Sequence, residues 1–359
     1  MITSHFPRGF LPSQDPVYHF ELYPEFEFIN VLGRDLPSLL LNKDFREYVS
    51  HLNIPFWPET NVKAENLPEL RLYYLRLGFV VSGYINQVGQ EAIHSLPENL
   101  ALPFVHACNL LNRPPILSYD GYALYNWKRF DVNKPVELGN IDTLQNFVHL
   151  YDEHWFILIH VDIEAKAQAI VEEVENLLNR PSQNLEQALH RIAGVILQQV
   201  AVLKRIPEFM SPELYFERFR PYIRFFEKVT YQGVEMAPMD YRGETGAQSS
   251  IMPLLEALMK IPHEPSVLLD HLKDMRNYMP AEHRALLIQV ESLSDFKHRA
   301  DKEAFNAVLD AMASFRSVHI QWAHDYIASK VSDPRGTGGT PYMQWLSLLI
   351  DETLSHKHS

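Results

Sequence analysis

Hydrophobic residues recur with helical spacing over most of the chain beyond residue 145. Apolar positions three and four residues apart predict amphipathic helices over residues 165–179 and 185–203. Other helices are indicated by their first turns, where a capping serine, a proline or an acidic residue is favourable. These starts lie at Ser211-Pro212-Glu213, at Pro253 with Ser249 or Ser250 as the cap, and at Pro280. The longest unbroken helix candidate is residues 302–330, which contain no proline or glycine.

The first part of the chain has a different pattern. Prolines at positions 7, 12, 16, 24, 37, 55 and 58 argue against long helices before residue 65. Helices are expected over residues 67–87 and 102–111, with Pro103 in the first turn of the second. Residues 113–127 read as irregular or extended. The pattern predicts a mainly α fold, with a small, mostly helical or irregular domain over 1–145 and a large all-α domain over 146–359.

Composition narrows the classes of function. The 359 residues include 32 Lys and Arg and 45 Asp and Glu, giving a net charge of −13, which disfavours nucleic acid as a partner. The single cysteine, Cys108, excludes an internal disulfide, a cysteine-rich zinc site and covalent haem attachment, and suggests a reducing cytoplasm. The N-terminus does not resemble a signal peptide, and no apolar run approaches the ~20 residues of a membrane helix, so neither secretion nor a membrane is expected.

His319 is the first candidate for chemistry. On a helix it shares one stripe with Met312, Phe315, Trp322 and Tyr326. A histidine within an apolar stripe needs a partner, because an unpaired buried ring nitrogen is costly. It is either a core residue bonded to a carbonyl or an axial haem ligand between apolar walls.

His160 has two possible settings, because residues 156–163 are as rich in β-branched residues as a strand but run into a strongly helical segment. In a helix, His160 shares a face with Phe156 and Ile163, as a satisfied core histidine would. In a strand, His160 and Asp162 together with His319 would match the facial triad of a non-haem iron site.

Arg220 lies among aromatic residues in segment 214–222, where it could bind a carboxylate while the rings pack a planar substrate. It could equally be a solvated arginine above a core stripe. Two glycine-containing segments, 241–250 and 336–340, are weaker candidates. The first precedes a helix N-terminus, which suits anions, and the second lacks the lysine of a nucleotide-binding P-loop.

Several of these segments together resemble the indoleamine 2,3-dioxygenase family. The matching stretches occur in order across the larger part of the chain: RPPILSYDGYALYNW at 113–127, NKP at 133–135, residues 215–222, GAQSS at 246–250, DMRNYMPAEHR at 274–284, FRSVH at 315–319 and GTGGT at 336–340. The resemblance implies a small N-terminal domain, a large all-α domain and one non-covalent haem b. It also implies that residues 156–164 are helical, which removes the facial triad.

The resemblance also implies roles for individual residues. His319 would ligate the iron, Arg316 would contact a haem propionate, and Arg220 would pair with the substrate carboxylate. The aromatic positions of the substrate pocket would be Tyr119, Phe156, Tyr215 and Phe216. Thr340 would help hold the substrate ammonium. Thr245 and Gly246 would lie near the haem edge, and Gly246 also counts as part of the substrate pocket. O₂ would be the co-substrate, L-tryptophan or a related indole the small-molecule partner, and N-formylkynurenine the product.

Two positions depart from the animal members of that family, which have serine in place of His160 and phenylalanine in place of Tyr215. A distal histidine is similar to that of tryptophan 2,3-dioxygenase, which accepts the indole N–H. His160 is therefore expected to bond the indole N–H or the bound oxygen, and it must be neutral to accept a proton. Alternatives are a related haem protein that rearranges a halotryptophan ring, a haem sensor or electron carrier with His160 as second iron ligand, and a haem-free helical module.

Overall fold

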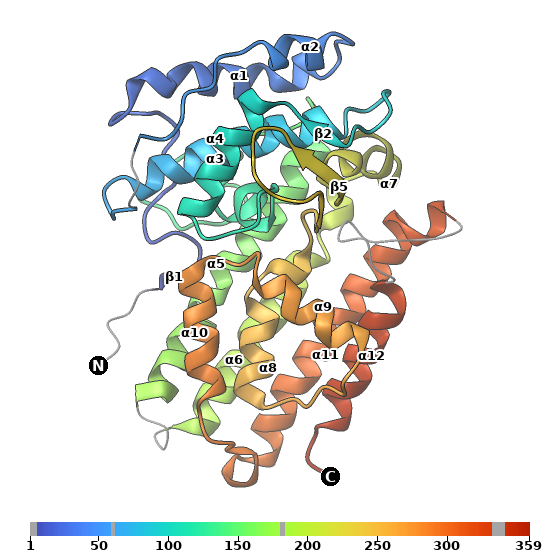
Figure 1. The fold of residues 1–359 in the computed structure, drawn as a ribbon. Helices are drawn as coiled ribbons and strands as arrows, with labels where there is room; N and C mark the ends of the chain where they lie inside the picture. Colours follow the sequence, from blue (N-terminus) through green and yellow to red (C-terminus); the bar gives the residue numbers. More distant parts are fainter. Residues whose placement is uncertain (1–5, 59–61, 180–183, 332–341) are drawn as a thin grey trace.

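The computed structural model describes residues 6–58, 62–179, 184–331 and 342–359, and in these the fold is mainly α, as predicted (Figure 1). The helices are α1 (Glu27–Leu39), α2 (Phe45–Ser50), α3 (Leu67–Ile85), α4 (Glu98–Leu110), α5 (Tyr151–Asn179), α6 (Leu185–Leu203), α7 (Pro212–Leu214), α8 (Ile251–Met259), α9 (Val267–Arg276), α10 (Ala281–Glu291), α11 (Lys302–Tyr326) and α12 (Tyr342–Ser355). None of the helices in these ranges is long and apolar enough to cross a bilayer.

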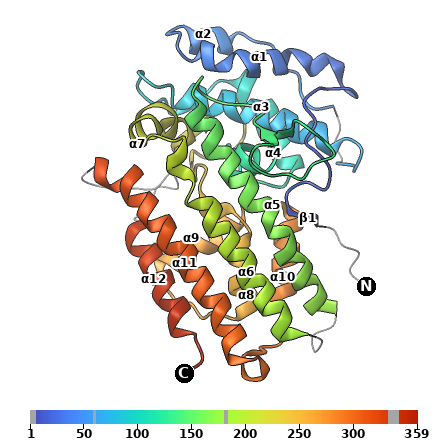
Figure 2. The same cartoon turned by 180° about the vertical axis from the view of Figure 1, so that it is seen from behind.

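The long helices run alongside one another as a bundle, with α1 to α4 packed across one end of it (Figures 1 and 2). Helix α11 packs against α6 and α12, and α5 packs against α6 and the short strand β1 (Pro7–Phe10). The amphipathic pattern of these helices explains the arrangement, because each buries one apolar face against its neighbours.

Small sheets join distant parts of the chain. Strand β5 (Phe226–Tyr231) pairs in parallel with β2 (Ser95–Leu96) and antiparallel with β6 (Met239–Tyr241). A separate antiparallel pair is formed by β3 (Lys128–Arg129) and β4 (Ile141–Asp142). The parallel pairing fixes residues 226–241 against the N-terminal part of the chain.

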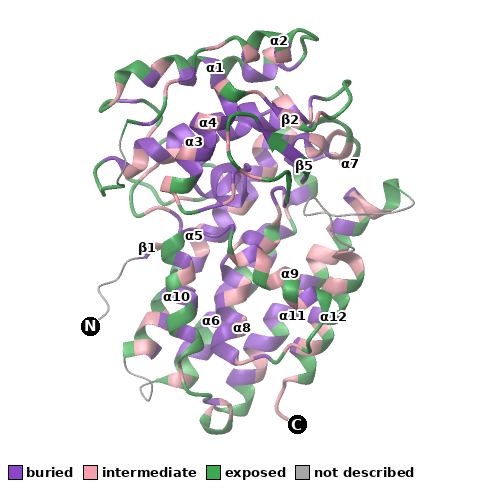
Figure 3. Ribbon diagram, in the orientation of Figure 1, coloured by how far each residue is buried: buried purple, intermediate pink, exposed green. Residues whose placement is uncertain are grey.

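The buried residues form two apolar clusters, and α5 contributes to both (Figure 3). One cluster is built mainly from α1, α3, α4 and residues 116–127, and it includes Ile157 and Val161 of α5. The other lies within the long-helix bundle and includes Ile159 and Ile163 of α5. Helix α5 is therefore covered on opposite sides. The domain division near residue 145 stays a prediction.

Several sequence expectations are confirmed, and others are wrong; the helix expected over 165–179, for example, already begins at Tyr151. Helices α6 and α10 begin as predicted, and the Ser211 hydroxyl caps Leu214 N–H. Residues 156–163 are helical, within the 29-residue α5 that exceeds α11 in length. The expected helix over 302–330 ends at Tyr326 and gives way to a 3-10 turn.

Two further expectations are wrong, and both concern where a proline can stand in a helix. Helix α1 extends over 13 residues although Pro37 lies in its last turn. The missing N–H of Pro37 would leave the Gly33 carbonyl without its helical donor, but Gln145 Nε2 donates to that carbonyl at 2.7 Å. Helix α4 begins at Glu98, so Pro103 lies in its interior rather than in its first turn.

Candidate functional site

A large cavity lies within the long-helix bundle, and both candidate histidines line it. His160 comes from α5 and His319 from α11. The empty space, counted out to the solvent at its mouth, is about 1740 Å³. Its other walls are mostly apolar and include Ile163, Leu203, Met210, Ile251, Leu268, Trp322, Leu346 and Leu349. Such a cavity suits a large planar apolar group with polar contacts at a few points.

The His319 imidazole makes no hydrogen bond with any residue that the structure describes, whereas the core-histidine interpretation requires one. Burial lowers the pKa of His319 to about 4, and the neighbouring His160 and Arg316 act in the same direction. The ring is therefore neutral near pH 7, with a lone pair available. A neutral imidazole on a rigid helix beside an apolar cavity is a donor that fits haem iron.

His160 has a tautomer fixed by its helix. Its Nδ1 lies 2.7 Å from the Phe156 carbonyl oxygen, one turn earlier in α5. A carbonyl only accepts, so Nδ1 carries the proton and Nε2 holds the lone pair. Burial lowers the pKa of His160, which keeps the ring neutral near pH 7. Because the segment is helical, Asp162 faces elsewhere and pairs with Lys166 at 3.0 Å, so the facial triad is excluded.

Aromatic side chains form the wall around His160. The Phe156 ring centroid lies 4.5 Å from that of His160 and 5.5 Å from that of Tyr215. The Tyr119 ring meets His160 edge-on at 5.8 Å. Tyr119, Phe156 and Tyr215 all line the cavity, as the resemblance suggested, but Phe216 is outside its lining and lies under the Arg220 guanidinium at 5.4 Å.

Arg220 acts on two tyrosines of the cavity wall. Burial raises the pKa of Tyr215 to about 12, and the Arg220 charge acts in the opposite direction. The same holds for Tyr342, whose pKa burial raises to about 12 while Arg220 opposes it. Both tyrosines line the cavity. Arg220 therefore lies close to both of these tyrosines, although it is not itself part of the cavity lining.

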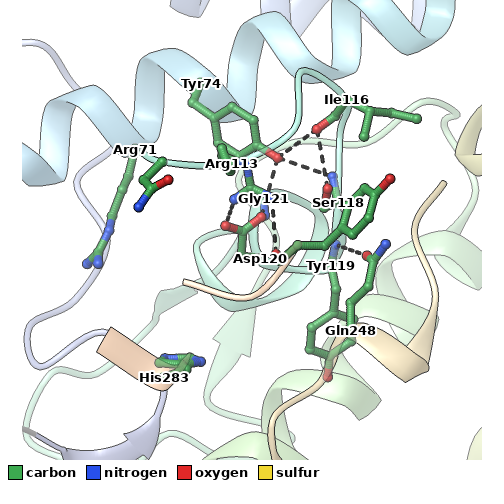
Figure 4. A network of polar contacts seen from close by, with 12 residues as sticks. Arg71, Tyr74, Arg113, Ile116, Ser118, Tyr119, Asp120, Gly121, Gln248 and His283 are labelled. Atoms are coloured by element: carbon green, nitrogen blue, oxygen red, sulfur yellow. Dashed lines mark hydrogen bonds and ion pairs between the residues drawn. The ribbon is translucent and has the colours of Figure 1, made fainter. Parts of the chain in front are cut away.

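A polar network holds the segment that carries Tyr119 (Figure 4). This segment is not irregular or extended throughout, as was expected, because Asp120–Leu124 form a π-helical turn directly after Tyr119. Arg113 and Asp120 form an ion pair in which both side chains are almost completely buried, and the Arg113 guanidinium lies over the Tyr74 ring at 4.3 Å. Gln248 Oε1 accepts a hydrogen bond from Tyr119 N at 2.9 Å. This bond ties the segment to the 3-10 turn Gly246–Gln248, so two distant motifs of the sequence support one wall.

Glu164 is a residue of the site that sequence reasoning missed. Its Oε1 accepts hydrogen bonds from Tyr119 Oη at 2.8 Å and from Ser249 Oγ at 2.6 Å. Burial raises the pKa of Glu164 to about 7, although both hydrogen bonds lower it. Glu164 follows His160 by one helical turn, and that spacing was the available indication of its position.

The haem-edge residues are only partly as expected. Thr245 and Gly246 line the cavity, as does Arg316. Arg316 pairs with Glu256 and donates to Thr353 Oγ1 and the Leu349 carbonyl, so its contact with a propionate remains a prediction. Thr340 and the whole 336–340 motif lie outside the described residues.

Two further polar residues on the cavity wall were missed. His271 has a buried Nδ1 with no hydrogen-bond partner in the described part of the chain, and burial lowers its pKa to about 4. Burial also raises the pKa of Glu244 to about 8. Neither residue falls in a spacing pattern that would have revealed it.

Comparison with known proteins matches this architecture. Residues 5–336 match the family model of indoleamine 2,3-dioxygenase. The chain is 30% identical to indoleamine 2,3-dioxygenase 1 of Rattus norvegicus, covering 90% of this chain and 87% of the relative. It is 26% identical to indoleamine 2,3-dioxygenase of Saccharomyces cerevisiae (97% and 91%) and 27% identical to a protein named myoglobin from Haliotis madaka (96% and 95%). The chain belongs to the indoleamine 2,3-dioxygenase family.

Proposed function

We propose that this protein is a haem-dependent dioxygenase that opens the indole C2–C3 bond of L-tryptophan and yields N-formylkynurenine. The observation that carries the proposal is the juxtaposition of two different histidines in one apolar cavity. His319 has no protein partner among the described residues, and His160 has its Nε2 lone pair left by the bond at Nδ1. One suits an iron ligand and the other suits a hydrogen-bond acceptor.

The residues present fit a haem b. His319 would hold the iron, the apolar walls would cover the porphyrin, and Arg316 and Thr245 would lie toward its edge. Non-covalent binding agrees with the single cysteine, Cys108, which is fully buried away from the surface. When bound, the haem supplies O₂ binding and the oxidation chemistry, and both oxygen atoms enter the product.

The protein's own contribution is positioning. Arg220 would pair with the substrate carboxylate through charge-assisted hydrogen bonds. Phe156, Tyr215 and Tyr119 would pack the indole, Phe216 would support the Arg220 side chain, and Gly246 would belong to the substrate pocket near the haem edge. The role proposed for Thr340, to help hold the substrate ammonium, falls outside the described residues. A substrate held by its carboxylate and its ring has one orientation, which replaces an improbable encounter of three components by a single bound geometry.

His160 would fix the indole by accepting its N–H at Nε2. This role requires the neutral ring, and burial favours that form by lowering the pKa of His160. The Phe156 carbonyl keeps the proton on Nδ1, so the acceptor faces away from the helix backbone. The same lone pair could approach a haem iron, and this is the basis of the alternative function.

The alternative is a haem protein without this catalysis, and the relatives named myoglobin favour it as the second candidate. In a sensor or electron carrier, His160 would be a second iron ligand besides His319. A relative that rearranges a halotryptophan ring would keep the haem and the aromatic wall but change the chemistry.

A cytoplasmic location, suggested by the cysteine content, is part of the proposal.

One experiment separates these functions. The haem-loaded protein is reduced without oxygen, L-tryptophan and then O₂ are added, and formylkynurenine absorbance is followed. The proposal predicts product and a ferrous iron that binds CO. A low-spin, six-coordinate ferrous iron that does not bind CO would favour the non-catalytic alternative. Turnover of a different indole would support the same class of reaction with another substrate.

A further inference from the structure

A second cavity lies in the N-terminal part of the molecule, away from the cavity that His160 and His319 line. It is bordered by α1, by β3, by residues 143–149 and by the first turn of α5. Its empty space, counted out to the solvent, is about 1300 Å³. Its lining is mostly polar and includes Glu27, Asn30, Arg34, Arg76, Lys128 and Arg129.

The charge of this lining is opposite to that of the chain. The whole protein has a net charge of −13, yet the cavity is lined by four arginine and lysine residues against one carboxylate, Glu27. A cavity with cationic walls concentrates anions, because low-dielectric surroundings focus the local field.

Arg76 is the buried cation of this cavity. The residue is 5% exposed, and each of its hydrogen bonds goes to a neutral acceptor. Nε donates to Asn30 Oδ1 at 3.0 Å, and Nη1 donates to the Leu144 carbonyl at 2.8 Å and to Gln145 Oε1 at 2.5 Å. Among the residues that the structure describes, Nη2 has no hydrogen-bond partner and no carboxylate lies within ion-pair distance of the guanidinium.

A buried guanidinium without a carboxylate is costly, and an entering anion would offset that cost. The nearest compensation is indirect, because Asn30 accepts from Arg76 and donates from Nδ2 to Glu27 at 2.9 Å. Burial lowers the pKa of Arg76 to about 10, which still leaves the side chain charged near pH 7. The vacant Nη2 position therefore offers a charged donor to a ligand.

Two more cations stand at the mouth with only loose partners. Lys128 Nζ is 3.9 Å from Asp142, with 44% of its side chain exposed. Arg34 Nε is 3.9 Å from Asp35, with 72% exposed. Arg129, by contrast, is bound to Asp15 and to two backbone carbonyls, so it adds charge to the cavity but has fewer donors to offer.

We propose that this cavity binds a small organic oxyanion, with Arg76 Nη2 as the buried donor and Lys128 and Arg34 as cations at the mouth. The planar guanidinium suits a carboxylate or a phosphate group, which is the chemistry shared by candidate ligands. The polar walls favour a hydrophilic metabolite over a lipid or an aromatic compound. This site does not depend on the dioxygenase function and uses none of its residues.

Calorimetric titration of the full-length protein with inorganic phosphate and with citrate, at matched ionic strength, tests the proposal. We expect saturable binding of at least one probe, and the tighter probe identifies phosphate or carboxylate as the preferred group. Lys128→Met and Arg34→Met should each weaken that binding roughly fivefold, and the double variant roughly 25-fold. Lys43→Met, an exposed cation between α1 and α2 and outside the lining, is the matched control and should bind as the wild type does.

Arg76→Met should abolish binding, but it also removes bonds to Leu144 and Gln145. The exposed variants therefore decide the question if that protein does not fold. Absence of saturable heat with both probes would overturn the proposal. So would binding that is unchanged in the Lys128→Met Arg34→Met double variant, because the anion would then bind elsewhere.

Discussion

Replacement of His160 by leucine tests the proposed role of the distal histidine most selectively. Leucine removes the Nε2 acceptor, is compatible with a helix, and can pack against the Phe156 and Tyr119 rings that surround the site. An indole N–H buried there without an acceptor costs about 1–3 kcal/mol. We therefore expect kcat/KM for L-tryptophan to fall by a factor of about 5 to 150.

The assay compares two substrates at saturating O₂. L-tryptophan has an indole N–H, and 1-methyl-L-tryptophan has none, so the methylated compound lacks the interaction that the substitution removes. The wild type should discriminate strongly against the methylated substrate, because a site built around a hydrogen bond rejects an analogue without it. In His160→Leu, kcat/KM should fall for L-tryptophan and stay unchanged for 1-methyl-L-tryptophan.

The pH dependence adds a second readout. Burial lowers the pKa of His160, so the neutral ring persists below pH 6.5 and activity falls only as the pH drops through that lowered pKa. His160→Leu should lack this acid limb. An equal loss of kcat/KM with both substrates would refute the reasoning, because the histidine would then act on something other than the indole N–H.

Three other predictions concern binding and stability. Arg220→Ala should raise KM for L-tryptophan about 10- to 150-fold and leave tryptamine, which has no carboxylate, unaffected in steady-state assays; equal effects on both would exclude carboxylate recognition. At about pH 4.5, where the raised pKa of about 7 keeps the buried Glu164 carboxyl group uncharged, Glu164→Ala should lower the free energy of unfolding in urea by about 1–3 kcal/mol for each of the two hydroxyls that lose their acceptor, and unchanged stability would contradict this. Burial lowers the pKa of His283 to about 4, so the unfolded chain binds the proton first. His283 alone should therefore contribute a loss of about 1.4 kcal/mol of apo-protein stability per pH unit from 6.5 toward 4, in addition to the losses from other histidines with lowered pKa values, and His283→Phe should reduce the slope by that amount. An identical slope in the variant would assign the loss to other groups.

The elements best predicted from the sequence were those specified locally. Helix α6 and the first turns of α7 and α10 follow from periodicity and capping residues, which act within a few positions. Helix α1 could not be extended past Pro37 on local evidence, since the compensating donor is Gln145 Nε2, more than one hundred residues away. Residues 156–163 looked like a strand because α5 is apolar on opposite sides, each facing its own cluster.

The candidate site could be predicted from the sequence only in part. The stripe around His319 marked it as a residue in need of a partner, but spacing could not choose between a carbonyl and a metal. The resemblance supplied the roles, and the structure brings His160, Tyr119 and Tyr215 to the same cavity as His319. Glu164 was missed because its function depends on Ser249, which a sequence pattern cannot bring into contact.

The central claim is that His319 ligates a haem iron, and resonance Raman spectroscopy of the ferrous haem-loaded protein tests it directly. We predict an iron–histidine stretching band in the wild type and in His160→Leu. In His319→Gly, with far-UV circular dichroism matching the wild type, that band should be absent and should return on addition of imidazole. An iron–histidine band that persists in His319→Gly without imidazole, or disappears in His160→Leu, would contradict the account.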